Sequence, residues 1–220
     1  MVPSAIIFVL LLLGNIHTST AGAVMPNFTI SAPPETDAWR VPPSTNIFNA
    51  PTHALIPSPA PLKSFQSARI TLTANWTTLY DHGGLLFHLT DASGNGQDQW
   101  VKTGMEWYQD QPYISTVATD NYADWSIFPT ASSGVTIEAR REESPGLWIY
   151  QIVKKADGSE ERRTLREVTW FFAKEDEDED EAGWMLDVRA MAARPATEDK
   201  VVGAEKELVV EFEDAEVVFR

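Results

Sequence analysis

Four side chains that could bind a polar ligand share the parity of one predicted strand. Trp100, Lys102, Glu106 and Tyr108 occupy even positions within residues 99–125, whereas odd positions of the same strand carry apolar side chains. Side chains at alternate positions of a β-strand point to opposite faces. The stretch therefore predicts a strand with one apolar face and one aromatic and polar face, and we expect any chemistry on the second face.

This aromatic and polar face has the composition of a carbohydrate-binding platform. Flat aromatic rings stack on the apolar side of a sugar ring, while charged groups form hydrogen bonds with its hydroxyls. We expect Tyr80, Asp81 and Trp125 to join the face. The alternative is that the same side chains are core residues, with Lys102 and Glu106 forming a cross-strand network beneath another segment. Both interpretations remain open from sequence.

A pair of carboxylates on this face would suit a glycosidase. Retaining enzymes need two carboxyl groups about 5 to 5.5 Å apart, one as nucleophile and one as acid. Asp81 and Glu106 would supply such a pair if their strands are neighbours. A run of the Glu-x-Asp-x-x-Glu type, by which sandwich glucanases place their acids on one strand, is missing. The first hypothesis is therefore a non-enzymatic binding module, and the alternative is a secreted carbohydrate-active enzyme of the glucanase type.

Two clusters of oxygen-bearing side chains resemble metal-binding loops without completing them. Residues 91–96 match the first half of a calcium-binding EF-hand loop, but Lys102 stands at the twelfth position, where a bidentate acid is needed. Asp120, Asn121 and Asp124 are weak candidates for a lectin-like calcium loop. Because Asp and Asn also favour turns, we predict turns and no metal site. The sequence has no nucleotide-binding or phosphate-binding fingerprint, so no cofactor is expected.

Strands must position these residues, because alternating or continuous apolar runs recur along the chain. Short strands, frequent turn signals and the lack of an amphipathic helix predict an all-β protein, an antiparallel β-sandwich or jelly roll. An Asp-Gly pair at 157–158 predicts a hairpin turn. The predicted strands cover 27–30, 68–76, 84–89, 100–108, 113–118, 135–141, 147–153, 166–173, 184–192, 208–212 and 215–219.

One segment, residues 33–61, holds eight of the fourteen prolines. Proline lacks a backbone N–H and fixes φ, so this segment is expected to be neither a helix nor a central strand. It also contains Trp39, Ile47 and Phe48, side chains that a free linker would lack. We predict that the segment wraps over the body of the fold and either covers the aromatic and polar face or leaves it open.

The composition limits the classes of partner. With 220 residues and 43% hydrophobic content, the chain is long enough for one β-sandwich domain, expected over residues 24–220. The net charge of -15, from 32 acidic and 17 basic residues, argues against binding of nucleic acid or an anionic membrane. The absence of cysteine excludes disulfides and thiolate chemistry. The acidic run 175–181 is predicted to be a solvated loop.

The N-terminal residues 1–23 have the pattern of a signal peptide, with an apolar run at 6–13 and small residues at 21 and 23. As a helix the run would span about 12 Å, against roughly 30 Å of bilayer hydrocarbon, so we expect no membrane anchor. The protein is predicted to be secreted if this segment is removed. The alternative is a cytoplasmic protein that starts at Met25.

Several short phrases of the sequence, in this order and spacing, are similar to those of one known family. They are DAWR (37–40), FNAP (48–51), YDHGGLL (80–86), WVKTGME (100–106), STVATD (115–120), ADWS (123–126), REVTW (166–170) and AARP (192–195).

Together these phrases resemble the family of the regulation-of-enolase protein. The resemblance implies a concanavalin A-like lectin/glucanase sandwich with no established enzymatic chemistry. It also implies a metabolic protein such as enolase as a partner, as the alternative to the carbohydrate that the aromatic and polar face suggests. Arg194, in the last phrase, is included among the expected ligand-binding residues.

Overall fold

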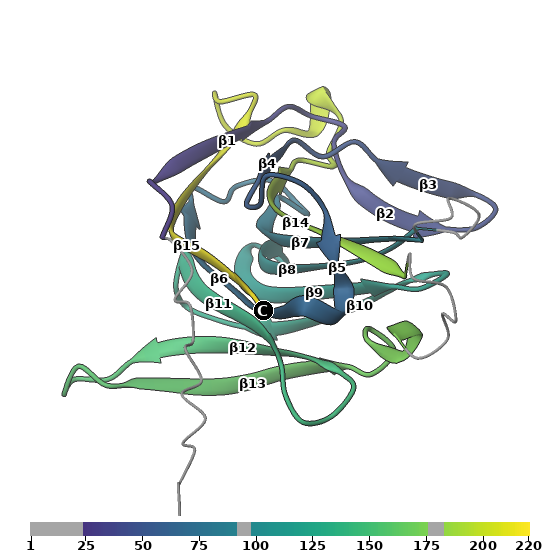
Figure 1. Ribbon diagram of the computed structural model, residues 1–220. Coiled ribbons are helices and arrows are strands. Elements are labelled where there is room, and N and C mark those ends of the chain that lie inside the picture. Colours follow the sequence, from purple (N-terminus) through teal and green to yellow (C-terminus); the bar gives the residue numbers. More distant parts are fainter. Residues whose placement is uncertain (1–23, 92–97, 176–182) are drawn as a thin grey trace, which may run out of the picture.

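The computed structural model describes residues 24–91, 98–175 and 183–220. Its larger sheet is antiparallel and contains the strand on which the sequence analysis centred (Figure 1). In spatial order this sheet consists of β10 (Ala123–Pro129), β9 (Gln111–Thr119), β8 (Gln99–Tyr108), β7 (His82–Asp91), β14 (Trp184–Ala193) and β4 (Thr52–Ala54), and β5 (Ala60–Pro61) also pairs with β14.

The smaller sheet packs against one face of the larger sheet. Its spatial order is β1 (Phe28–Ala32), β15 (Leu208–Phe219), β6 (Phe65–Ala74), β11 (Gly134–Arg141), β12 (Leu147–Lys154) and β13 (Glu160–Val168). A separate hairpin is formed by β2 (Ala38–Val41) and β3 (Thr45–Phe48), and short 3-10 helices cover Leu62–Ser64, Ala173–Glu175 and Glu198–Lys200.

The main core lies between the two sheets. Val101 and Met105, at odd positions of β8, are buried there with apolar side chains of the smaller sheet such as Ile70 and Phe212. Burying one such side chain stabilises the fold by roughly 1.5–3 kcal/mol relative to leaving it exposed. The parity of the strand therefore fixes which face meets the core, and the even positions lie on the outer face of the larger sheet. The predicted antiparallel β-sandwich is confirmed.

The strands differ most from the prediction in three respects. The predicted strand 166–173 ends at Val168, and the following residues form turns that place Phe171 and Phe172 in the core. The runs 208–212 and 215–219 form one strand, whose irregular register contains Asp214 at φ 50°. The sequence analysis missed β10, which has no buried residue, and β2, β3 and β4 of the proline-rich segment, which have four residues or fewer.

Three expectations fall wholly or mostly outside the described residues: the signal peptide-like segment 1–23, the turn at 91–96 and the acidic loop 175–181. At the start of the loop, Glu175 is described and forms an ion pair with Arg141. Within the described part of the chain, no helix is both long and apolar enough to cross a membrane.

Candidate functional site

The β2–β3 hairpin covers part of the outer face of the larger sheet. Arg40 of β2 is buried and donates hydrogen bonds to three backbone carbonyl oxygens, at distances of 3.1, 3.0 and 2.7 Å. The accepting residues are Asn121, Asp98 and Asp120, which lie next to β8, β9 and β10. The proline-rich segment therefore does wrap over the sheet, and a guanidinium group holds it in place.

The hairpin covers one end of the aromatic and polar face. Trp100 is only 2% exposed and packs in a second apolar cluster with Ala38 and Leu86. The rings of Phe48 and Trp100 lie 6.0 Å apart. Trp100 is therefore a core residue beneath the hairpin, as the second interpretation of the sequence expected.

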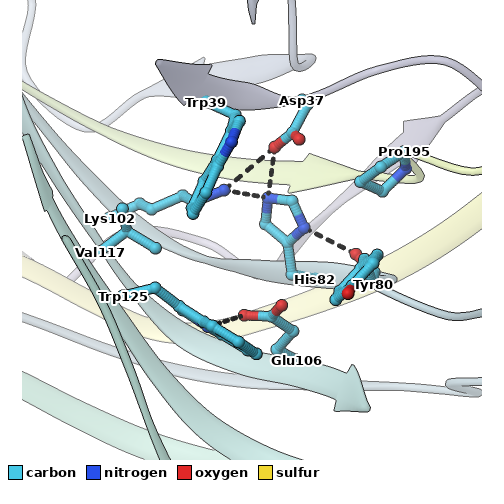
Figure 2. Close-up of a pocket in the computed structure, with 9 residues that line it drawn as sticks. All are labelled: Asp37, Trp39, Tyr80, His82, Lys102, Glu106, Val117, Trp125 and Pro195. Carbon is cyan, nitrogen blue, oxygen red and sulfur yellow. Dashed lines mark hydrogen bonds and ion pairs between the residues drawn. The ribbon is translucent and has the colours of Figure 1, made fainter. Parts of the chain in front are cut away.

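The other end of the face remains open as a pocket of about 330 Å³ (Figure 2). This volume lies at the lower end of the range of small-molecule sites, roughly 300–1,000 Å³. Strands β7, β8, β9 and β10, the start of the hairpin and the loops before β7 and after β14 all contribute side chains. The lining residues are Asp37, Trp39, Tyr80, His82, Lys102, Glu106, Val117, Trp125 and Pro195.

Glycines keep the sheet bare beside the polar groups of the pocket. Lys102, Gly104 and Glu106 follow one another on the outer face of β8, and Gly104 lies directly opposite Gly84 of β7. Neither glycine has a side chain to fill the space between Lys102 and Glu106. Both charged side chains are only 7% exposed although they line the pocket.

A hydrogen-bonded network joins three polar groups on one side of the pocket. His82 Nδ1 lies 2.8 Å from the carbonyl oxygen of Tyr80, which can only accept, so Nδ1 carries the proton. His82 Nε2 then accepts from Lys102 Nζ at 2.9 Å, and Lys102 Nζ also donates to Asp37 Oδ1 at 3.1 Å. Because His82 is neutral in this arrangement, its 3.6 Å separation from Asp37 is no ion pair. Tyr80 presents its carbonyl from a backbone with φ 66°, uncommon for a residue with a side chain.

Within the network, the pKa values of both His82 and Asp37 are lowered. The imidazole therefore loses its charge, whereas the carboxylate keeps its charge. Burial lowers the pKa of His82 below its ordinary value and the charge of Lys102 lowers it further, while Asp37 and Glu106 only partly offset this. Burial alone would raise the pKa of Asp37, but the charge of Lys102 and the hydrogen bonds from Lys102 and Ala38 outweigh it, so the pKa is lowered. Near neutral pH, the network therefore holds a neutral imidazole and an ionised Asp37.

Replacing His82 by asparagine is expected to flatten the pH dependence of stability. Below the ordinary histidine pKa of about 6.5, the unfolded chain binds a proton that folded His82 does not bind, so stability falls as pH decreases. This one group contributes at most about 1.4 kcal/mol per pH unit. Asparagine can still donate to the Tyr80 carbonyl. Urea denaturation at several pH values between about 5 and 7.5 measures the slope, and equal slopes for both proteins would contradict the assignment.

A second polar contact lies on the opposite side of the pocket (Figure 2). The indole Nε1 of Trp125 donates to Glu106 Oε2 at 3.0 Å. The ring of Trp125 also meets Tyr80 and Tyr108 edge to face, with centroid distances of 6.3 and 5.3 Å. Tyr108 supports these rings but does not line the pocket.

Two expected site residues, Asp81 and Arg194, lie outside the pocket. The Asp81 carboxylate is fully buried and accepts from Arg194 Nε at 2.8 Å and Nη2 at 2.7 Å. It also accepts from the backbone N–H of Thr78 at 3.1 Å. Asp81 immediately precedes His82 and so faces the other way. The expectation that it shares a face with Glu106 is corrected, and both of its oxygens are occupied by Arg194.

The candidate calcium ligands have protein partners instead. The side chains of Asp120 and Asp124 form contacts with Gln99 and Arg166, respectively, and the backbone carbonyl of Asn121 accepts from Arg40. In residues 24–91, 98–175 and 183–220, no group of three or more His, Cys, Asp or Glu residues could hold a metal ion.

Sequence reasoning missed five of the lining residues. Asp37 and Trp39 stand in the phrase DAWR, which carried part of the family resemblance, so a signal for them was present. His82 lies on the outer face of β7 and stands in the phrase YDHGGLL, so a signal was present for it as well. Val117 and Pro195 also stand in phrases that carried the resemblance, STVATD and AARP, but an apolar side chain and a proline gave no chemical reason to select them as site residues.

The fold and the site define a class of protein: an antiparallel two-sheet β-sandwich with a recessed pocket on the outer face of its larger sheet. Residues 18–217 match the family described as Protein of unknown function (DUF1349). The chain belongs to this family.

One relative and two solved structures are similar to this chain. The chain is 43% identical to an uncharacterized protein of Emericella nidulans. The match extends over 187 residues, which are 84% of this chain and 82% of the relative. A crystal structure of a functionally unknown protein from Saccharomyces cerevisiae has a TM-score of 0.57 at 16% identity, over 92% of this chain and 94% of that one. The catalytic domain of an endo-1,3-beta-glucanase (laminarinase) from Thermotoga petrophila has a TM-score of 0.43 at 7% identity. The match covers 71% of this chain and 64% of that one.

Proposed function

We propose that this protein binds a carbohydrate in the outer-face pocket and does not cleave it. The observation that carries the proposal is the composition of the pocket, where the aromatic rings of Trp39, Tyr80 and Trp125 line the same recess as the polar groups of Lys102 and Glu106. Rings of this kind stack on the apolar side of a sugar, and the polar groups orient its hydroxyls. The volume of the pocket suits one sugar unit of a longer glycan better than an extended chain.

Binding is favoured over hydrolysis by the states of the carboxylates. Glycosidases need one carboxyl group that stays protonated to act as the acid. Asp37 is held ionised by Lys102, and its pKa is lowered. Asp81, the expected partner of Glu106, is bound on both oxygens by Arg194. The secreted glucanase-like enzyme therefore lacks its expected pair.

The second partner implied by the family resemblance is a metabolic protein such as enolase. A protein partner binds an extended surface of about 800 Å² on each side, whereas the feature that gathers rings and charges here is a recess. We therefore propose the carbohydrate as the ligand, and binding of a purified enolase is a control in the experiments below.

Replacing Trp125 by alanine is expected to weaken carbohydrate binding by at least about tenfold, equivalent to about 1.4 kcal/mol. The substitution removes a ring from the pocket wall and the donor to Glu106. A glycan array of the wild-type protein identifies the bound sugar, and isothermal titration calorimetry then measures the affinity of each variant. Release of reducing ends from the same sugar tests for hydrolysis.

Trp148→Ala is the matched control, because this tryptophan lies on β12 of the smaller sheet, away from the pocket. Its affinity should equal that of the wild type, and circular dichroism should show both variants folded. If no glycan binds the wild-type protein, or if both tryptophan variants lose the same affinity, the proposal is wrong. Hydrolysis of the bound sugar would contradict the non-enzymatic part, and capture of enolase alone would favour the protein partner.

A further inference from the structure

The charges in the pocket do not balance. Asp37 and Lys102 neutralise one another, with Lys102 Nζ 3.1 Å from Asp37 Oδ1, and His82 carries no charge in its present tautomer. Glu106 is the third charged side chain of the pocket, and neither Asp37 nor Lys102 neutralises it. Among the described residues its carboxylate has one hydrogen-bond donor, the indole of Trp125, and no lysine or arginine forms an ion pair with it. The pocket therefore holds one unpaired negative charge.

This unpaired carboxylate is almost buried, at 7% exposure. A carboxylate with little access to water is costly unless charged or hydrogen-bonding partners compensate it. The second oxygen of Glu106 is free to accept a hydrogen bond from a molecule in the pocket. A ligand with a positive charge and N–H donors would satisfy the charge and the free oxygen together.

The aromatic side chains beside Glu106 favour the same kind of ligand. Trp125 is held against the carboxylate by its own hydrogen bond, and the ring of Tyr80 meets that indole edge to face at 6.3 Å. Trp39 lines the same pocket (Figure 2). Electron-rich ring faces attract ammonium groups, most strongly where water is excluded. The net charge of -15 for the whole chain also attracts a cation from solution.

We propose that the pocket selects a sugar that carries a protonated amine, of the glucosamine type, and that Glu106 recognises its ammonium group. This inference rests on the proposed carbohydrate binding and specifies its ligand class. An ammonium has three N–H donors, one of which Glu106 accepts while the others remain for neighbouring acceptors or water. An N-acetylated sugar lacks the charge, and an acidic sugar would be repelled by Glu106. Lys102 does not oppose the ammonium, because Asp37 neutralises it.

Three disaccharides with the same linkage test the inference: those of glucosamine, N-acetylglucosamine and glucose. Calorimetry near pH 6 and at low salt should give the wild-type protein an affinity for the glucosamine disaccharide at least about tenfold above that for the other two. Raising the salt concentration should reduce this preference, because screening weakens the attraction between charges.

Glu106→Gln removes the charge but keeps an oxygen that can accept from Trp125. It should lower the preference, measured as the ratio of the affinities of this one variant for the glucosamine and glucose disaccharides, to about onefold. Glu161→Gln on β13 is the matched control, since it makes the same change of charge on an exposed strand of the smaller sheet. It should keep the full preference.

The outcomes separate this inference from the function on which it rests. Equal wild-type affinities for the three disaccharides, or tighter binding of the N-acetylated one, would overturn the amine selectivity while leaving carbohydrate binding intact. Retention of the preference in Glu106→Gln would remove the role of Glu106. If none of the disaccharides and no glycan of the array binds, both proposals fail. Comparison of the amine with its N-acetyl form in the wild-type protein needs no variant to fold.

Discussion

Replacing Asp81 by alanine is expected to lower the free energy of unfolding by about 3–5 kcal/mol, a large part of the stability of an ordinary domain. Asp81 and Arg194 are 0% and 2% exposed and are joined by two hydrogen bonds of 2.8 and 2.7 Å. Removing the carboxylate leaves a buried guanidinium without its counter-charge, although it keeps its hydrogen bonds to the carbonyls of Glu205 and Lys206. It also removes the acceptor of the Thr78 N–H.

Urea denaturation followed by tryptophan fluorescence measures this loss. The control is Asp124→Ala, because Asp124 pairs with Arg166 in the same chemical combination but on the surface, where such a pair contributes about 0–1 kcal/mol. A double variant, Asp81→Ala with Arg194→Met, should lose less than the sum of the single changes, since no unpaired charge is left buried. A loss below about 1 kcal/mol for Asp81→Ala would show that the pair is not structural.

The structural role of Asp81 illustrates what the sequence could not predict. Its type and its expected place near Glu106 suggested a catalytic acid, but the face to which its side chain points depends on which residue of β7 lies opposite Glu106. That residue is His82, so the neighbouring Asp81 points to the other face, and its partner Arg194 is 113 positions away along the chain. No local pattern carries such a pairing. In contrast, alternation along β8 depends only on the strand itself, and the two faces expected for it were correct.

The proline-rich segment shows a second limit. Its prolines correctly indicated that it would be no central strand, and Trp39 correctly indicated that it would pack on the body of the fold. How much of the sheet it covers is set by Arg40, which binds carbonyls brought together only by the folded sheet. The question of whether the face is covered or open therefore has a divided answer: Trp100 is covered, and Glu106 lines the pocket.

Replacing Gly104 by alanine is the second substitution for which we expect a large effect. A Cβ at Gly104 would lie 2.0 Å from the carbonyl oxygen of Gly83 and 2.6 Å from the Cα of Gly84. Both are backbone atoms of the neighbouring strand β7 and cannot rotate away. Relief requires β7 and β8 to separate in the interior of the larger sheet, which we expect to cost about 3 kcal/mol or more, at or above the upper end for added methyl groups.

The same separation should also reduce ligand binding, because β7 carries His82 while β8 carries Lys102 and Glu106, so the pocket depends on their spacing. Gly158→Ala is the control. Gly158 has φ 84°, but a Cβ there would meet no atom within 4 Å, so only backbone strain remains, about 1 kcal/mol. Urea denaturation and calorimetry of both variants separate strain from steric overlap. Equal stability of Gly104→Ala and Gly158→Ala would mean that the two strands can move apart at little cost and that the close approach of Gly84 and Gly104 does not fix the pocket.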